Sequence, residues 1–482
     1  MAALGRPFQG PACHLLFEGR CRMPYLTREE IEAFEPDPLP CPGVTAIGHA
    51  RRVMKRSGNW NANQQMGRRW PIGCVALEIT QRCNLDCTLC YLSENSEAVR
   101  DLPLEEVFLR IELIYRYYGR NTDVQITGGE PTLRRRDELL AIVRKVRALG
   151  MRPTFMTNGI RATRALLEEL ATAGLVDVSF HVDTTQRIKG YASEVELNEI
   201  RQTYIDRARG LPLSVLFTTT VHRRNFHEIP DLVRFFKANA GVVRTASFQL
   251  AADTGRGAHG GRGDAITPDS VAKQIEAGAG TSINFEASLI GHPACNRYGM
   301  CLEVKGRLFD ALDDTTFIGR MLSATAHLDL PRNDTASVIK SFLWWLAANP
   351  RHCIPIVKWA ARKVWRMREE LVAARGRVNT ISFLIHNFMH SGALERDRIN
   401  ACVFKVMTAD GPVSMCMHNA KRDHFILQPI SVRTPDGRKY WQPLTGKMRL
   451  NPDVAGDVKP EQHGLKRLKG LARQRLLARR SA

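Results

Sequence analysis

The chain has 482 residues, of which 44% are hydrophobic, so it is long and apolar enough for one large α/β domain with appended segments. A formal net charge of +20 predicts a surface that attracts anions, whether nucleic acid, anionic lipid headgroups or phosphorylated substrates. Twelve cysteines are too sparse for a disulfide scaffold. The sequence has no run of about 18 uncharged apolar residues, so no membrane span is predicted. The first residues lack the pattern of a secretory leader, so we expect a protein of the reducing cytoplasm.

The first two segments of the chain differ in regularity. Residues 1–71 are rich in proline and basic residues and predict an irregular N-terminal extension. Residues 72–290 alternate short apolar runs with amphipathic stretches, which predicts β-α-β units and an α/β fold with a parallel sheet, open or curled into a partial barrel. Strands are predicted at 74–80, 123–129, 152–159, 176–184, 213–221 and 245–251, and helices at 104–119, 136–150 and 162–174.

The two segments after residue 290 have another character. Residues 291–425 form a predicted C-terminal auxiliary segment, in which 339–377 mixes tryptophan, aliphatic and basic residues. Residues 426–482 form a basic tail, whose stretch 464–480 carries seven basic residues and no acidic one. Such segments can lie peripherally at the inner face of a membrane, because tryptophan favours the interface and basic residues attract anionic lipid. A solvated basic helix and an ordinary pair of core helices explain the same pattern.

Three cysteines are clustered directly after the first predicted strand. Cys83, Cys87 and Cys90 have the spacing C-x3-C-x2-C, and thiolates bind soft metals and iron–sulfur clusters well. Three thiolates on a cluster of four irons leave one iron open for an exogenous ligand. The alternative is a zinc knuckle completed by a distant histidine or cysteine, although zinc sites usually use two closely spaced pairs.

This spacing, with Tyr91 directly after the last cysteine, resembles the signature of the radical S-adenosylmethionine (SAM) superfamily. The resemblance implies a partial (β/α)6 TIM-like barrel and a [4Fe-4S] cluster whose open iron binds SAM. It also implies an electron donor, either a small-molecule reductant or a protein of the flavodoxin or ferredoxin type. Reductive cleavage of SAM would then give a 5′-deoxyadenosyl radical that abstracts hydrogen from an unactivated C–H bond.

A second motif, TGGEPTL, follows the second predicted strand. Its glycines allow the backbone to approach a ligand closely, and its glutamate is an acceptor for an amine. Alone, the motif is also consistent with a plain turn. About forty residues after the cysteines it resembles the superfamily's loop for the methionine amino group, which implicates Gly128, Gly129, Glu130 and Pro131 as cofactor-binding residues.

Polar residues also mark the ends of the third and fourth predicted strands. Thr157 and Asn158 in MTNG resemble the superfamily's third strand end, near the SAM-binding face, although they can equally cap the following helix. Ser179, His181 and Asp183 should share one face of a strand, because side chains alternate with a period of two. We predict contacts with ribose or substrate for them, with a structural role as the alternative.

Four further cysteines, Cys295, Cys301, Cys402 and Cys416, are enough for a second iron–sulfur cluster or a zinc ion. Their alternative role is that of buried free thiols. Their surroundings, with segments such as SFQLAADTGRG, GHPAC and FLIHNFMH, resemble one branch of the superfamily, the archaeal tetraether lipid synthases and pterin dimethyltransferases. That branch has Cys-Ser-His-Pro where this chain has 290–293 as Ile-Gly-His-Pro, so one of its cluster ligands is missing here.

Three functions compete. The leading hypothesis is a radical SAM enzyme that acts on a lipid or another hydrophobic substrate at a membrane surface, by C–C bond formation or alkylation. A radical SAM peptide maturase is the second, since residues 402–416 read C-x8-G-x4-C, like the start of those enzymes' auxiliary-cluster domain. A non-catalytic metal protein that binds nucleic acid is the third. The sequence contains no recognised RNA-binding module, so RNA is a less favoured partner than lipid, and no DNA partner is expected.

Overall fold

The computed structural model describes residues 24–256, 262–263, 265–332, 334–434 and 437–452. The predicted basic stretch 464–480 therefore lies outside the described residues. Within the described N-terminal part, two short helices, α1 (Arg28–Glu32) and α2 (Ala46–Arg56), interrupt the predicted irregular extension.

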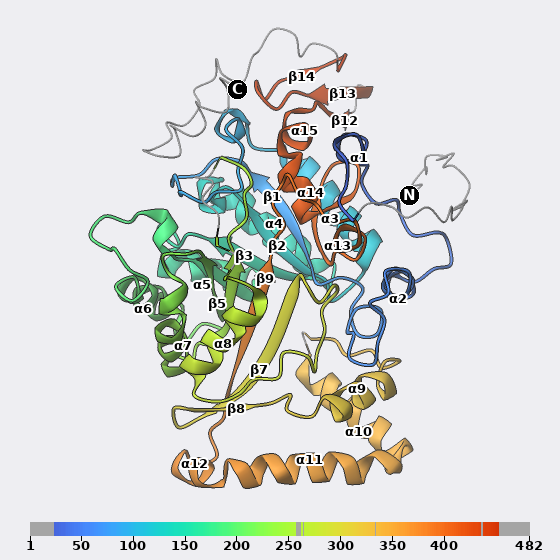
Figure 1. Ribbon diagram of the computed structural model, residues 1–482. Coiled ribbons are helices and arrows are strands. Elements are labelled where there is room, and N and C mark those ends of the chain that lie inside the picture. Colours follow the sequence, from blue (N-terminus) through green and yellow to red (C-terminus); the bar gives the residue numbers. More distant parts are fainter. Residues whose placement is uncertain (1–23, 257–261, 264, 333, 435–436, 453–482) are drawn as a thin grey trace.

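The centre of the molecule is a twisted sheet of eleven strands (Figure 1). Six of them follow one another in chain order, and all five pairings between them are parallel. This arrangement confirms the α/β class and the run of six β/α units; the barrel is partial, since the sheet does not close. The six strands are β1 (Cys74–Thr80), β2 (Asp123–Gly128), β3 (Arg152–Thr157), β4 (Asp177–His181), β5 (Ser214–Val221) and β6 (Val243–Leu250).

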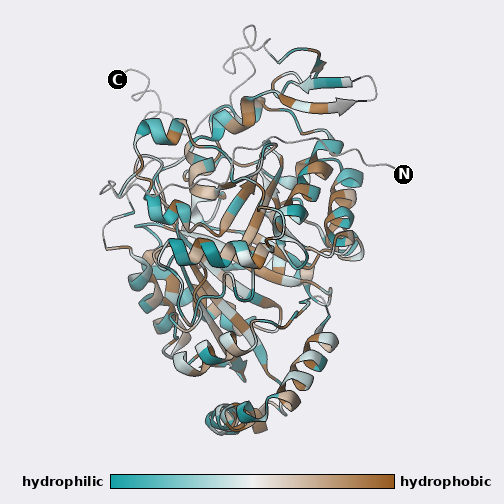
Figure 2. Cartoon of the chain, turned by 90° about the vertical axis from the view of Figure 1, so that its right-hand side faces the viewer, coloured by the Kyte–Doolittle hydropathy of each residue, from teal (hydrophilic) through white to brown (hydrophobic). Residues whose placement is uncertain are grey.

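Helices cover the outer face of this sheet and enclose the main hydrophobic core. All seven residues of β1 are buried, as expected for a parallel strand that is packed on both faces. Figure 2 shows apolar residues along the central strands and two-sided helices around them. The predicted end of the first core helix at Gly119 is confirmed, and this glycine has a φ of +76°. The helices are α3 (Leu104–Tyr118), α4 (Arg136–Ala148), α5 (Arg164–Thr172), α6 (Asn198–Ala208), α7 (Ile229–Ala238) and α8 (Pro268–Ala279).

Strands from beyond residue 290 extend the same sheet at both edges. β9 (Asn379–Asn387) pairs in parallel with β6, and β10 (Phe404–Met407) pairs in parallel with β1. The sheet therefore crosses the predicted boundary at residue 290. Three antiparallel strands complete it: β7 (Asn296–Val304), β8 (Arg307–Asp310) and β11 (Pro412–Ser414).

Two groups of elements lie at opposite ends of the molecule (Figure 1). Helices inserted between β8 and β9 form the lower end. Nowhere in the described parts of the chain is a helix long and apolar enough to cross a membrane. The lower group is α9 (Thr315–Ala324), α10 (Thr335–Ala348), α11 (Cys353–Arg366) and α12 (Arg368–Ala373). The upper group is α15 (Arg422–Leu427) and a small sheet of β12 (Ile430–Thr434), β13 (Gly437–Trp441) and β14 (Met448–Arg449). The short helices α13 (Arg396–Asn400) and α14 (Met415–Ala420) lie lower, beside the main sheet.

Candidate active site

A cavity of about 230 Å³ lies inside the partial barrel, at the carboxyl ends of the parallel strands. Ligands of parallel α/β folds gather at this end, because the loops after the strands converge there. Strands β1 to β6 and β10 all contribute to the wall, as do the three loops singled out in the sequence. The predicted site residues on the wall are Cys83, Cys87, Cys90, Gly128, Gly129, Glu130, Thr157, Asn158 and His181.

The cysteine loop follows β1 without an intervening helix and brings all three thiols to the cavity. The Sγ of Cys83 accepts a hydrogen bond from the backbone N–H of Leu85 at 3.4 Å. Burial, together with the neighbouring thiols of Cys90 and Cys83, raises the pKa of Cys87 well above its ordinary value. Among the residues that the structure describes, no three His, Cys, Asp or Glu side chains are arranged to share a single metal ion.

The cysteine loop is anchored to its neighbours through Tyr91. The phenol O–H donates to the backbone oxygen of Gly128 at 2.6 Å, which ties the cysteine loop to the second motif. Gly255 packs from the other side, and a Cβ there would lie 2.4 Å from the backbone oxygen of Cys90. The loop after β6 therefore fits against the cysteines only with glycine at this position.

The two glycines of the second motif are required by close backbone packing. A Cβ on Gly128, which has a φ of +131°, would lie 1.9 Å from the carbonyl oxygen of Thr80, and one on Gly129 would lie 2.1 Å from that of Arg82. The same backbones are hydrogen-bonded, with Gly129 N–H to Thr80 at 2.9 Å and Glu130 N–H to Arg82 at 2.7 Å. The start of the cysteine loop and the second motif thus form one rigid unit.

Glu130 is buried and links the second and third strand ends. Its Oε1 accepts from the hydroxyl of Thr157 at 2.8 Å and from the N–H and hydroxyl of Thr132 at 3.1 and 2.6 Å. Its Oε2 accepts from the backbone N–H of Asn158 at 2.8 Å. A carboxylate has about four acceptor positions, so Oε2 retains room for one further donor such as a ligand amine. Pro131 begins the short 3₁₀ turn η2 (Pro131–Leu133) behind it.

The fourth strand end differs in part from the prediction. Ser179 and His181 lie on β4, but the strand ends at His181, and Asp183 instead caps the 3₁₀ turn η3 (Thr184–Gln186). The carboxylate of Asp183 is fully buried, 2.6 Å from Nε2 of His181, and accepts from the N–H of Thr220 at 2.8 Å. Burial lowers the pKa of His181, but Asp183 outweighs this and raises it above the ordinary value. His181 faces the cavity with Asp183 as its support, whereas Ser179 contacts the hydroxyl of Thr218.

A buried ion pair beside the cavity was not anticipated. Both terminal nitrogens of the Arg422 guanidinium, Nη1 and Nη2, donate to Glu78 of β1, at 3.0 and 2.9 Å, and the guanidinium lies 4.8 Å from the ring centroid of Tyr91. Although burial opposes ionisation, Arg422 and His418 lower the pKa of Glu78 to about 2. The pair joins α15 to β1. Only the polar position within the apolar run of β1 hints at it in the sequence.

A second unanticipated group is Arg256, which is 1% exposed and lies behind the cysteine loop. Its Nη2 donates to Glu97 at 3.2 Å, and its Nε lies 3.9 Å from the carboxylate of Asp86. Burial lowers its pKa, but the neighbouring thiol of Cys90 and the carboxylate of Glu97 outweigh this and raise it. Within the described part of the chain, both oxygens of Asp86 and two nitrogens of Arg256 are buried without a hydrogen-bond partner. Such unsatisfied polar atoms are typical of a site that a ligand completes.

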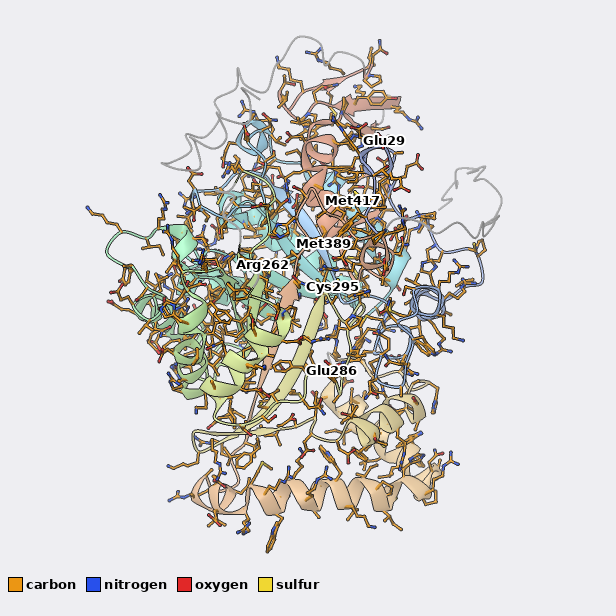
Figure 3. All side chains as sticks on the ribbon, viewed as in Figure 1. Glu29, Arg262, Glu286, Cys295, Met389 and Met417 are labelled. Carbon is orange, nitrogen blue, oxygen red and sulfur yellow. The ribbon has the colours of Figure 1, made fainter. Side chains whose placement is uncertain are left out.

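The downstream cysteines separate into two groups. Cys402 interacts electrostatically with both Cys295 and Cys416, and Nε of Arg398 lies 3.2 Å from the Sγ of Cys295. Burial raises the pKa of Cys295 to about 11 and that of Cys416 to about 12. Figure 3 shows Cys295 at the upper end of β7. Cys416 also lines the main cavity, so this group adjoins the first site.

Cys301 is not part of that group. It lies on β7 opposite Ile381, whereas Asn296, next to Cys295, lies opposite His386. Five residues of strand separate the two positions by about 17 Å. Cys301 is fully buried, and burial together with Asp310 raises its pKa to about 12. The structure therefore does not bring all four predicted cysteines together.

Comparison with known proteins identifies the domain that carries this site. Residues 77–236 match the sequence model of the Radical SAM superfamily. The 7,8-dihydro-6-hydroxymethylpterin dimethyltransferase of Methanocaldococcus jannaschii is 30% identical over 187 residues, covering 37% of this chain and 36% of that protein. A probable GTP 3′,8-cyclase of Pyrococcus abyssi is 34% identical over 176 residues, covering 35% of this chain and 55% of that protein. The chain thus spans about a third to half of these relatives.

Among solved structures, native anSMEcpe with bound AdoMet is similar over 42% of this chain and 58% of that chain, with 15% identity and a TM-score of 0.32. The matched residues 77–236 contain the three clustered cysteines, the glycine-rich motif and strand ends β2 to β5. Residues 77–236 of this chain therefore form a radical SAM domain.

Proposed function

We propose that this protein is an enzyme that generates a 5′-deoxyadenosyl radical and abstracts a hydrogen atom from an unactivated C–H bond. One observation carries the proposal: the thiols of Cys83, Cys87 and Cys90 share a single cavity with the backbone of Gly128–Glu130. Three thiols would hold three irons of a cubane cluster, and the glycine-rich loop on the same cavity wall would contact the ligand of the fourth iron.

The residues present fit such a cofactor. The three thiols line one cavity, and the unsatisfied atoms of Asp86 and Arg256 lie behind the same loop. A [4Fe-4S] cluster held there would supply, from an external reductant of the flavodoxin or ferredoxin type, the electron that cleaves SAM into methionine and the 5′-deoxyadenosyl radical. Gly128 and Gly129 would allow the ligand to approach the backbone, and Oε2 of Glu130 would accept one N–H of its amine.

The rest of the cavity wall favours a hydrophobic substrate. Beyond the cysteines its apolar lining includes Leu250, Phe388, Met389 and Met415, and polar side chains come from the strand ends and from Asn419 and Arg422. Apolar walls exclude water, which protects a radical from unwanted reactions and binds hydrocarbon without fixed polar partners. We therefore assign the substrate to lipids or similarly apolar molecules, modified by C–C bond formation or alkylation.

Release of 5′-deoxyadenosine tests the reaction class. Protein reconstituted anaerobically with iron and sulfide should release it from SAM when a reductant is added, and a Cys87→Ala variant should release none. Cys353→Ala is the matched control, because Cys353 begins α11 and lies outside the cavity. If the unaltered protein releases no 5′-deoxyadenosine, or if Cys87→Ala retains this activity, the proposed reaction is wrong.

Lipid profiles test the substrate class separately. A strain that lacks this protein should lose or accumulate a lipid species, and the unaltered gene should restore the profile while the Cys87→Ala gene should not. An unchanged lipid profile, with SAM cleavage intact in vitro, would leave the reaction in place and point to a peptide substrate instead.

We also propose that Cys295, Cys402 and Cys416 hold a second iron–sulfur cluster. Arg398 supports this, because its guanidinium lies next to Cys295 and opposes the effect of burial by lowering the pKa of that thiol. Iron analysis should give about eight irons per chain, and about four in a Cys402→Ser variant. Cys301→Ser, on β7, should keep the full iron content; about four irons in the unaltered protein would overturn the second site.

A further inference from the structure

The helices at the lower end of the molecule present an apolar outer face that no other described element covers. In α11, Ile354, Val357, Val364 and Trp365 are 55–68% exposed. At 100° per residue these positions fall within one sector of the helix, so they form a continuous apolar row. In α12, Val372 is 81% exposed.

The preceding helix, α10, carries a similar row. Ile339, Leu343 and Trp344 are 55–70% exposed and recur at the spacing of one helical face. Large apolar side chains so exposed are costly in water, and contiguous patches of them mark interaction sites. Figure 1 shows α11 at the periphery, with its lower side facing away from the sheet.

The inner face of α11 is, by contrast, firmly packed. Trp359 stacks on Phe317 of α9 with ring centroids 5.5 Å apart, and the buried ammonium of Lys363 lies 2.7 Å from Asp313. Met367, at the end of the helix, is 4% exposed. These contacts fix the orientation of α11, so its apolar row is held facing outward.

Basic residues lie along one side of this apolar row. Residues 335–378 contain nine lysines and arginines and two acidic residues. On α11 itself, Lys358, Arg362 and Arg366 are exposed on one flank of the row. Arg362 and Arg366 also pair with Asp313 of the protein at 3.1 and 2.7 Å, whereas Lys358 has no ion pair within the described residues and is the basic group most available to a lipid. Arg368 follows at the end of the row.

We propose that the outer face of α10–α12 docks this protein on an anionic membrane surface. Tryptophan and aliphatic side chains would enter the headgroup region, and the flanking basic residues would contact lipid phosphates. α11 has 14 residues and is about 21 Å long, too short to span a bilayer but long enough to lie in its interface.

Two other binding partners fit this outer face less well. A symmetric contact between two copies would place the same basic flanks against each other, which is unfavourable. Nucleic acid would satisfy the basic residues but leave the apolar row against polar phosphates. A surface with anionic headgroups above a hydrocarbon layer satisfies both features at once.

Vesicle flotation with the full-length protein tests the proposal. It should float with vesicles of phosphatidylglycerol and phosphatidylcholine, less with phosphatidylcholine alone, and less as salt is added. A Val357→Asp/Val364→Asp variant should weaken binding about tenfold or more, because two carboxylates replace apolar groups at the interface. Leu109→Asp on α3, where Leu109 is 47% exposed, should bind as the unaltered protein does.

Each contrary outcome has a clear meaning. The proposal fails if the protein does not float with anionic vesicles, or if the double variant floats as well as the unaltered protein. It also fails if the protein is a dimer in light scattering and the double variant is a monomer, because the face would then join two copies. Circular dichroism should show that both variants stay folded. Neither metal nor SAM is needed, so the result does not depend on the proposed reaction.

Discussion

The buried pair Glu78–Arg422 allows a quantitative prediction about stability. Both side chains are almost fully buried, and the pKa of Glu78 is lowered from 4.5 to about 2. Since each pKa unit corresponds to about 1.4 kcal/mol, ionised Glu78 contributes about 3 kcal/mol. Because the folded-state pKa lies below the unfolded one, this contribution is complete above pH 4.5 and is lost as the pH falls towards 2. Glu78→Gln removes it and leaves Arg422 buried without a countercharge.

Urea unfolding of the metal-free protein at pH 7 measures this loss. We expect Glu78→Gln to lower the free energy of unfolding by about 3 kcal/mol, and a Glu78→Leu/Arg422→Met double variant to lose less, because no unpaired charge remains. The control is Asp137→Asn in the exposed pair Asp137–Arg135, which should change stability by about 0.5 kcal/mol or less. If Glu78→Gln unfolds like the unaltered protein, or if the double variant is as unstable as the single one, the buried charge pair does not stabilise the fold in this way.

Three further predictions concern the site and its surroundings. Gly129→Ala should displace the second motif by about 1 Å and lower 5′-deoxyadenosine release on the order of 100-fold. The control Gly241→Ala should leave the rate unchanged, because its added Cβ would meet nothing within 4 Å. Equal rates in the two variants would show that close packing at Gly129 is not required. Burial lowers the pKa of His386 to about 4, so the free energy of unfolding should fall by about 3 kcal/mol as the pH drops from 6.5 to 4 and the unfolded state gains a proton first. A His386→Gln variant should lack this part of the decline in urea unfolding. An unchanged pH dependence would count against a buried neutral imidazole. Arg256→Met should lower the midpoint potential of the proposed first cluster by several tens of millivolts, because it removes a positive charge near Cys90. A redox titration followed by electron paramagnetic resonance measures this, and Arg256→Lys should stay closer to the unaltered value. An identical potential in Arg256→Met would show that this charge has no effect on the cluster.

Local patterns predicted the first half of the sheet well. β1 was predicted at its observed bounds, and the remaining five core strands to within three residues at each end, because each is a short apolar run closed by glycine, proline or a polar residue. Asp183 was misplaced because the period of two continues past His181, while the backbone already turns into η3. β10 has four residues, and nothing in so short a run specifies β1 as its partner.

The chemistry of the site was predictable where it depends on residues that are close in sequence. Cys83, Cys87 and Cys90 lie on one loop, and the need for Gly128 and Gly129 follows from tight backbone packing. Their roles with a cofactor remain predictions until metal and SAM binding are measured. The Glu78–Arg422 pair joins positions 344 residues apart, and Arg256 meets Glu97 across 159 residues. Such pairs depend on the completed fold, so neither partner marks the other in the sequence.

The pairing of Cys74 in β1 with Phe404 in β10 also determines the order in which the protein can be assembled during synthesis. The cysteine loop leaves the ribosome long before β10, so one edge of β1 stays unpaired during synthesis, and such an edge promotes aggregation. In that interval the cavity lacks Arg422 and the walls formed by Phe388 and Met415. A cluster inserted early would be exposed to water and oxygen. If the three thiols hold the proposed cluster, it should be inserted after the last strands of the sheet have been made, and cells that synthesise the protein faster than it folds should accumulate iron-free chains.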